Sequence, residues 1–319
     1  MSEFKRILLT GGAGFIGSNL THNLLRSNYH ITCLDNFDPF YPRKQKELNV
    51  KPFLDHPNYQ LIEGDIRNPD VFLQVGDIDV ILHLAAKAGV RPSIQNPILY
   101  QEVNVNGTQN LLEFARERKI KQFVFASSSS VYGINKNVPW QEEEKLLPIS
   151  PYASTKLAGE MLGHVYSYLH GIRFLALRFF TVYGPGQRPD LAIHKFFKSI
   201  LNDEPIPVFG NGSTSRDYTY VDDIIKGIES TINYNQSDFE IINLGNHHTI
   251  KLSELIMAIE EICGMPGIIN RQPDQPGDVP QTFASIKKAE ELLNYYPETE
   301  LKTGLSKFYQ WYKQNQNLG

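Results

Sequence analysis

The amino-acid sequence predicts an α/β protein, in which a Rossmann-type, doubly wound parallel sheet is followed by a smaller mixed α/β domain. Strand-like and helical segments alternate through the first half of the chain, and a glycine-rich turn at residues 10–17 joins the first strand to the first helix. Repeated strand–helix units favour parallel strands with right-handed crossovers. We expect a first domain at residues 1–180 and a second at 181–319, with segments near 216–245 returning to the first sheet.

The individual elements follow from hydrophobic periodicity and from the positions of proline and glycine. In the first half, strands are predicted at residues 6–10, 30–35, 59–63, 80–84, 121–126 and 172–179, and helices at 15–28, 97–118 and 151–170. In the second half, helices are predicted at residues 191–202, 221–233, 252–263 and 301–314, and a strand at 240–244.

Composition narrows the classes of function. The chain has 319 residues and a net charge of −4, so it carries no basic excess of the kind that nucleic acid attracts. No apolar run approaches the length of a membrane span, and the first strand begins too early to leave room for a signal peptide. Cys33 and Cys263 lie far apart and are expected to be free thiols, which fits a reducing compartment. We expect a cytoplasmic protein that binds neither nucleic acid nor membrane.

The glycine-rich turn indicates a dinucleotide site. Gly12, Gly14 and Gly17 fit the pattern G-x-G-x-x-G, and Gly11 begins an overlapping G-x-x-G-x-x-G pattern. Such a turn lets the backbone approach a pyrophosphate at a helix N-terminus, although an ordinary strand–helix turn is the alternative. Asp35 ends the second predicted strand, where a carboxylate accepts the ribose hydroxyls of NAD and repels the 2′-phosphate of NADP. We therefore expect NAD as the cofactor.

The third predicted strand ends in Gly64-Asp65-Ile66, at the edge of the sheet that lines the ligand crevice in this fold class. There Asp65 would bond the adenine amino group and Ile66 would pack on its ring.

A serine run and a tyrosine–lysine pair predict the chemistry. Ser127 to Ser130 follow the fifth predicted strand, and Tyr152 and Lys156 stand four residues apart on a predicted helix, so they share a face. A lysine ammonium beside a phenol lowers the pKa of the phenol, and such a tyrosine serves as a general base toward a sugar hydroxyl. Each element alone is common on ordinary surfaces, but their order behind a dinucleotide turn favours catalysis.

Other polar residues are expected to have structural roles. Neighbouring residues on an extended segment face opposite ways, so His247 and His248 do not predict a metal site. His83 ends a predicted core strand and is interpreted as a satisfied structural histidine. The run at residues 142–144, three glutamates, is interpreted as a solvated surface.

The whole chain resembles the extended short-chain dehydrogenase/reductases, and among them the nucleotide-sugar epimerases. The resemblance rests on motifs that follow one another in the order of that family: TGGAGFIG at 10–17, LDNF at 34–37, GDIR at 64–67, HLAA at 83–86, NVNGT at 104–108, SSSSVYG at 127–133, YASTK at 152–156, RFFTVYGP at 178–185, RDYTYVDD at 216–223 and QPGDVPQT at 275–282.

This resemblance implies roles for individual residues and a homodimer built from the helices at 97–118 and 151–170. The implied catalytic residues are Ser128, Tyr152 and Lys156. The implied NAD-binding residues are Gly11, Gly14, Phe15, Ile16, Gly17, Asp35, Asn36, Asp65, Ile66, Leu84, Ala85, Ala86, Asn104, Ser127, Tyr152, Lys156 and Phe179. The NAD is expected to be tightly bound.

The resemblance also narrows the reaction. Related dehydratases carry Asp-Glu at the positions of Ser129 and Ser130, because eliminating water needs an acid and a base. Because this chain has no carboxylates at these two positions, the resemblance implies epimerisation at C4 of a UDP-hexose and not dehydration. In that reaction a 4-keto sugar forms transiently and is reduced again on the opposite face. A nucleotide-sugar dehydrogenase or reductase with exchangeable cofactor is the more distant alternative.

The sugar is predicted from residues around the implied substrate site. These are Lys87, Arg91, Ser128, Ser129, Ser130, Thr181, Arg188, Val208, Phe209, Arg216, Gln275 and Asp278. Ser129, Ser130 and Thr181 with Arg188 would bind a C6 carboxylate, so UDP-glucuronate to UDP-galacturonate is the preferred assignment, with UDP-glucose or UDP-N-acetylglucosamine as the alternative. Lys87 departs from the Gln usual in glucuronate epimerases, and either faces the sugar or phosphate or points to solvent.

Overall fold

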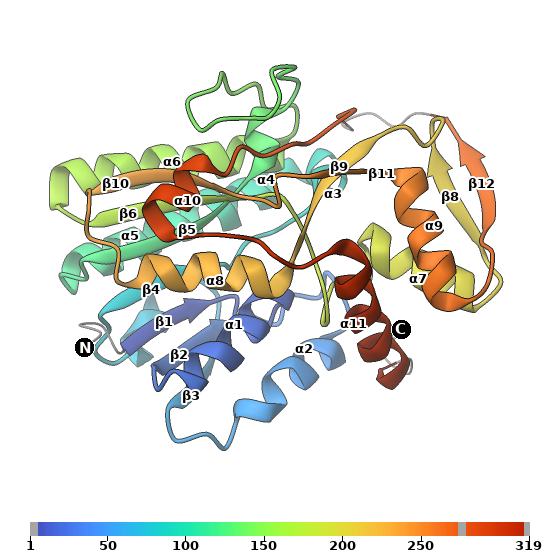
Figure 1. Ribbon diagram of the computed structural model, residues 1–319. Coiled ribbons are helices and arrows are strands. Elements are labelled where there is room, and N and C mark those ends of the chain that lie inside the picture. Colours follow the sequence, from blue (N-terminus) through green and yellow to red (C-terminus); the bar gives the residue numbers. More distant parts are fainter. Residues whose placement is uncertain (1–5, 274–278, 316–319) are drawn as a thin grey trace.

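The computed structural model describes residues 6–273 and 279–315 and is organised around a seven-stranded parallel sheet (Figure 1). The strand order across the sheet is β10-β6-β5-β4-β1-β2-β3. The strands are β1 (Arg6–Thr10), β2 (His30–Asp35), β3 (Tyr59–Glu63), β4 (Val80–His83), β5 (Gln122–Ser128), β6 (Arg173–Phe179) and β10 (Phe239–Leu244). The order reverses at β1, which puts a crevice between the segments that follow β1 and β4, as expected for a doubly wound sheet.

Both faces of the sheet are covered, which explains why its strands read as continuous apolar runs. Ile7 and Leu9 of β1 belong to one hydrophobic core, and Leu8 between them belongs to the other. On the Ile7 side the sheet is packed by α1 (Phe15–Arg26) and α8 (Val221–Ile232), and on the Leu8 side by α5 (Gly107–Glu117) and α6 (Pro151–His170), as Figure 1 shows.

The long helix α6 carries two of the predicted catalytic residues, and its ends are well defined. The Ser150 hydroxyl accepts a hydrogen bond from the Ala153 N–H at 3.2 Å, and Pro151 occupies the first helical position. Gly171 ends the helix in the left-handed conformation. Because α6 packs on β5 and β6, its first turns lie next to the carboxyl end of β5.

The second half of the chain forms smaller sheets and their helices. β7 (Thr181–Tyr183), β9 (Ser215–Tyr220) and β11 (Thr249–Lys251) form one sheet, and β8 (Pro205–Phe209) pairs with β12 (Ile268–Gln272). The helices of this region are α7 (Ala192–Leu201), α9 (Leu252–Cys263) and α11 (Leu301–Gln314), and α10 (Lys287–Leu293) packs on β10 of the main sheet. The predicted helices are present here, but the short strands other than β10 were not predicted.

The remaining elements are short. They are α2 (Arg43–Val50), α3 (Val90–Gln95), α4 (Pro97–Gln101), the 3-10 turns Lys51–Phe53, Pro69–Gln74 and Ser129–Tyr132, and a π-helical turn at Glu102–Asn106.

Two sequence interpretations need correction. The segment 97–118 is not one regular helix, because the π-helical turn separates α4 from α5. The run 142–144 is not uniformly solvated, because the carboxylate of Glu142 is buried and accepts the Asn243 N–H at 2.8 Å. By contrast, His83 is a satisfied core residue: its ring lies 2.7 Å from the Thr10 hydroxyl and 2.9 Å from the Thr108 hydroxyl.

Candidate active site

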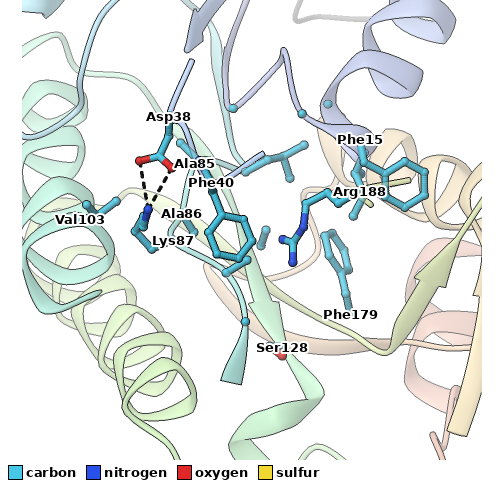
Figure 2. A pocket seen from close by; sticks show the side chains of 18 of the residues that line it. Phe15, Asp38, Phe40, Ala85, Ala86, Lys87, Val103, Ser128, Phe179 and Arg188 are labelled. Atoms are coloured by element: carbon cyan, nitrogen blue, oxygen red, sulfur yellow. Dashed lines mark hydrogen bonds and ion pairs between the residues drawn. The ribbon is translucent and has the colours of Figure 1, made fainter. Parts of the chain in front are cut away.

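A cavity of about 500 Å³ opens at the carboxyl ends of the central strands and collects most of the predicted site residues (Figure 2). From the predicted cofactor set it is lined by Gly11, Gly14, Phe15, Ile16, Gly17, Asp35, Asn36, Asp65, Ile66, Leu84, Ala85, Ala86, Ser127, Tyr152, Lys156 and Phe179. From the predicted substrate set it is lined by Lys87, Ser128, Ser129, Ser130, Thr181 and Arg188.

The glycine turn forms the floor of this cavity. Gly11 has a φ of +76°, and a Cβ built there would lie 2.7 Å from the Ala85 nitrogen. A Cβ on Gly17 would lie 2.3 Å from the Gly11 carbonyl oxygen. The turn can therefore close only without side chains, and it brings the N-terminus of α1 to the cavity wall, where a bound anion is favoured.

Asp35 stands beside this turn at the end of β2. Its carboxylate accepts the N–H groups of Ala13 at 3.0 Å and Phe37 at 2.8 Å. Burial raises the pKa of the Asp35 carboxyl, while the positive charge of Lys46 acts in the opposite direction. Lys46 is itself buried and lines the cavity, with its ammonium 4.8 Å from the centroid of the Tyr41 ring.

Asp65 lines the same end of the cavity but already has partners. Arg67 binds its carboxylate at 2.8 Å, and the Asn36 amide donates to it at 3.0 Å. The hydrogen bond with Arg67 is the main reason that the pKa of Asp65 is lowered to about 2. The carboxylate is therefore ionised and acts only as an acceptor near neutral pH.

The three predicted catalytic residues meet at the opposite end of the cavity. Ser128 ends β5, and its hydroxyl is close enough to the Tyr152 phenol to lower the pKa of that phenol. The Lys156 ammonium donates to the Ala126 carbonyl oxygen at 2.6 Å and lies 6.0 Å from the centroid of the Tyr152 ring. The arrangement puts a phenol, a hydroxyl and an ammonium around one space.

Burial dominates the acid–base properties of this group. It raises the pKa of Tyr152, against the Ser128 hydrogen bond and the positive charge of Arg188. It also lowers the pKa of Lys156 to about 7, against the negative charge of Glu160. The pKa of Tyr152 is therefore raised and not lowered as expected, because desolvation outweighs the Ser128 hydrogen bond and the charge of Arg188.

Behind the catalytic residues lies a buried ion pair that the sequence reasoning missed. Arg178 binds Glu160 through two hydrogen bonds of 2.9 and 2.8 Å, and neither side chain is more than 1% exposed. The Ser127 hydroxyl donates to the same carboxylate at 2.5 Å. A usable signal was present, since Glu160 follows Lys156 by one helical turn.

A smaller cavity of about 160 Å³ adjoins the first and shares Ser129, Ser130 and Thr181 with it. Ser150, Arg216 and Thr282 complete its polar lining. The Ser130 hydroxyl is buried there without a hydrogen-bond partner among the described residues. A buried hydroxyl in this situation is available to a ligand.

The other predicted substrate residues lie outside the two cavities or outside the described part of the chain. Arg91 on α3 lies with its guanidinium 5.1 Å from the centroid of the Phe209 ring on β8, so it connects the two halves of the chain. Val208 belongs to the hydrophobic core and lines neither of these two cavities. Gln275 and Asp278 lie outside the described residues.

Two predicted site residues have protein partners. The Asn104 amide binds the backbone N–H and carbonyl of Lys87 at 2.8 and 3.0 Å, and Asn104 does not line the larger cavity. The Lys87 ammonium contacts both carboxylate oxygens of Asp38, at 2.9 and 3.1 Å, and its side chain is 14% exposed, so it does not point to open solvent.

Asp38 belongs to a cover over the cavity, formed by residues 38–41 together with Lys87 and Arg188 (Figure 2). Arg188 lies 5.2 Å from the centroid of the Phe40 ring and binds Asp190 at 2.8 Å. The cavity-lining residues that sequence reasoning missed include Asp38, Phe40, Tyr41, Lys46, Val103 and Leu191.

Across residues 6–273 and 279–315, no group of three or more His, Cys, Asp or Glu side chains has a metal-binding arrangement. Over the same ranges, none of the helices has both the length and the apolar character that a membrane crossing requires.

Comparison with known proteins gives consistent matches over nearly the whole chain. The family model described as GDP-mannose 4,6 dehydratase matches residues 8–308. An uncharacterized UDP-glucose epimerase of Bacillus subtilis is 41% identical, over 94% of this chain and 96% of its own length. A UDP-glucuronate 4-epimerase of Thermodesulfobacterium geofontis is 36% identical, over 98% of this chain and 97% of its own. The solved structure of a Bacillus cereus UDP-glucuronic acid 4-epimerase with UDP-glucuronic acid and NAD is similar at a TM-score of 0.91 and 39% identity, covering 97% of this chain and 99% of that chain.

Proposed function

Because this chain belongs to the extended short-chain dehydrogenase/reductase family that the GDP-mannose 4,6 dehydratase model describes, we propose that it is an NAD-dependent UDP-sugar 4-epimerase. The observation that carries the proposal is the meeting of Ser128, Tyr152 and Lys156 in one cavity with the glycine turn, where Ser129 and Ser130 stand in place of an acid–base pair. Without those carboxylates, dehydration lacks its proton donor and acceptor.

The residues of the cavity fit NAD. The turn from Gly11 to Gly17 closes only without side chains, because a Cβ at either position would clash with backbone atoms, and it brings the N-terminus of α1 to the cavity wall. Asp35 would hold the adenine ribose, and Lys46 would add a positive charge beside it. NAD, when bound, supplies a reversible acceptor for the hydrogen at C4 of the sugar.

The chain's own groups handle the proton. The phenol oxygen of Tyr152 takes the proton of the C4 hydroxyl and later returns it to the epimer. The hydrogen bond from Ser128 orients that oxygen and stabilises its negative charge. Lys156 supplies a nearby positive charge from a fixed position, because its ammonium is held by the Ala126 carbonyl. Burial raises the pKa of the Tyr152 phenol and the positive charge of Arg188 opposes that rise, so positive charge near the phenol favours its phenolate.

For the sugar we propose UDP-glucuronate, converted to UDP-galacturonate. The support is the cation of Arg188 at the cavity wall together with the unpartnered hydroxyl of Ser130, which lines both cavities. A charged guanidinium and hydroxyl donors suit a C6 carboxylate. Relatives with this named activity support the same assignment. UDP-glucose is the alternative, favoured by the relative from Bacillus subtilis.

A direct test needs only the purified protein and two substrates. UDP-glucuronate and UDP-glucose are incubated separately without added NAD, and the sugars are separated by chromatography. We expect the C4 epimer of UDP-glucuronate to accumulate faster, because NAD stays bound through purification. Formation of neither epimer, in protein shown to contain NAD, would falsify the proposal. A faster reaction with UDP-glucose would retain the epimerase and replace the sugar.

We also propose a homodimer formed through α4, α5 and α6. Met161, Val165 and Leu169 stand exposed along α6, and Ile98 is exposed on α4. An apolar surface of this kind marks an interaction site. Leu169→Glu should shift the sedimentation coefficient to that of a monomer, whereas a wild-type protein that already sediments as a monomer contradicts the dimer.

The remaining assignments are cytoplasmic localisation, a role in polysaccharide biosynthesis, and two functional regions. Residues 1–180 would hold NAD and residues 181–319 the UDP-sugar, with the segments near 216–245 returning to the first sheet. Fractionation of the native host, with NAD-dependent activity assayed in each fraction, tests the localisation.

A further inference from the structure

The ion pair between Asp38 and Lys87 joins two chain segments that line the cofactor cavity. β1 lies between β2 and β4 in the sheet, and Thr10 near its end pairs with Leu34 of β2 and His83 of β4. The three strands therefore end at one edge. Asp38 follows the end of β2 and Lys87 follows the end of β4, so a contact between them spans the glycine turn that follows β1.

The two partners come from backbone segments of different character. Lys87 is fixed, because the Asn104 amide binds its backbone N–H and carbonyl and also donates to the Thr155 hydroxyl at 3.0 Å. Asp38 stands in the irregular segment 36–42, where its carboxylate also accepts the Phe40 N–H at 3.0 Å. The ion pair thus ties a loop to a rigid anchor.

The surroundings strengthen this tie. The side chains of Lys87 and Asp38 are only 14% and 27% exposed, so water screens their attraction less than at an open surface. Phe40 packs between two cations, with the Lys87 ammonium 5.4 Å and the Arg188 guanidinium 5.2 Å from its ring centroid (Figure 2).

We propose that Asp38 and Lys87 form a clasp that retains NAD, and that their ion pair must open before NAD can enter or leave. The clasp rests on the proposed function only in that NAD is the cofactor. It makes NAD a resident group of the enzyme, and it explains why a lysine in this position serves the site without touching the sugar.

The test measures how fast NAD leaves. Protein loaded with radiolabelled NAD is mixed with excess unlabelled NAD, and the label that remains bound is followed in time. We expect Lys87→Met and the isosteric Asp38→Asn each to accelerate the loss of NAD about tenfold, a change within reach of a partly buried ion pair. The double variant should be no faster than either single variant, because both changes remove the same contact.

The matched control is Arg43→Met, which lies in the same part of the chain. Arg43 binds Glu63 at 2.8 and 2.7 Å, so its removal breaks another ion pair after β2, but one that does not cross β1. Its NAD should leave at the wild-type rate. Unchanged loss of NAD from Lys87→Met and Asp38→Asn would overturn the clasp, and so would additive effects in the double variant. This readout needs no sugar, so it remains informative if the epimerase proposal fails.

Discussion

The floor and the cover of the cofactor cavity are built on different principles. The floor is backbone: it is the turn from Gly11 to Gly17, which closes only because no Cβ intervenes. The cover is side chains: it depends on an ion pair and on a ring stacked between two cations. A backbone floor is rigid and cannot be rebuilt locally, whereas a side-chain cover can open and close. The floor therefore determines whether NAD binds, and the cover determines how fast it dissociates.

The largest effect is expected from breaking the floor. In Gly17→Ala the new Cβ would lie 2.3 Å from the Gly11 carbonyl oxygen, so the turn must distort. We expect purified Gly17→Ala to carry no NAD, measured by releasing cofactor with acid. Gly76→Ala is the control, because a Cβ there meets nothing within 4 Å. A normal NAD content in Gly17→Ala would show that the floor tolerates a side chain.

The next effect separates binding from chemistry. Tyr152→Phe keeps the ring and removes only the proton-carrying oxygen, so NAD should stay bound while kcat falls roughly 10²–10⁴-fold. Steady-state rates and the NAD content of the same preparation provide both measurements. Tyr168→Phe, at an exposed position of the same helix, should behave as wild type. Turnover that survives in Tyr152→Phe would remove this phenol from its role.

A third prediction concerns the stability of the protein at acid pH and depends on His83, whose ring contacts the Thr10 hydroxyl beside the glycine turn. Burial, with the charge of Lys156 as a smaller cause, lowers the pKa of His83 to about 3 from its ordinary 6.5. Below pH 6.5 His83 binds a proton in the unfolded chain but stays neutral in the folded chain. The contribution of neutral His83 to the free energy of unfolding is therefore fully present above pH 6.5 and is lost as the pH falls toward 3. At pH 5 the loss is roughly 2 kcal/mol.

The measurement is thermal unfolding between pH 7.5 and 4.5. His83→Gln cannot take up the proton, so its melting temperature should fall less steeply with pH than that of the wild type. The comparison uses slopes, which removes the cost of the substitution itself. Parallel curves would mean that His83 is protonated without penalty in the folded protein.

The smallest effect is expected at the proposed sugar site, on kcat/KM. Ser130→Ala removes a hydroxyl that lines both cavities and has no hydrogen-bond partner among the described residues. Hydrogen bonds to charged groups are the stronger class, so kcat/KM for UDP-glucuronate should fall about tenfold and that for UDP-glucose by less. Ser154→Ala, exposed on α6, is the control. An equal fall in kcat/KM with both sugars would show that Ser130 does not bind the C6 carboxylate.

The same division explains what could be predicted from the sequence. The floor was predictable because it depends on local rules: Gly11 and Gly17 permit the turn, and Asp35 ends a strand that periodicity identifies. The position of Tyr152 and Lys156 followed from helical spacing on α6. These features need only neighbours in the chain.

The cover was not predictable, because its contacts join residues that the sequence keeps apart. Asp38 and Lys87 are separated by 49 positions, and segment 36–42 has no periodicity that would orient its side chains. The partners of Asn104 were not predictable for the same reason, since they are the backbone of Lys87 and the hydroxyl of Thr155. The strands β7, β8 and β9 were missed because their pairing depends on segments elsewhere in the chain.

The place of β10 at the edge of the main sheet has a consequence for biosynthesis. This strand pairs with β6 along its whole length, from Phe239↔Phe174 to Leu244↔Phe179, yet the ribosome makes it about sixty residues later. Until then β6 has an open edge, a template for association with other chains. A nascent chain that paused after residue 180 would display that edge, so its folding should finish only once residue 244 has left the ribosomal tunnel.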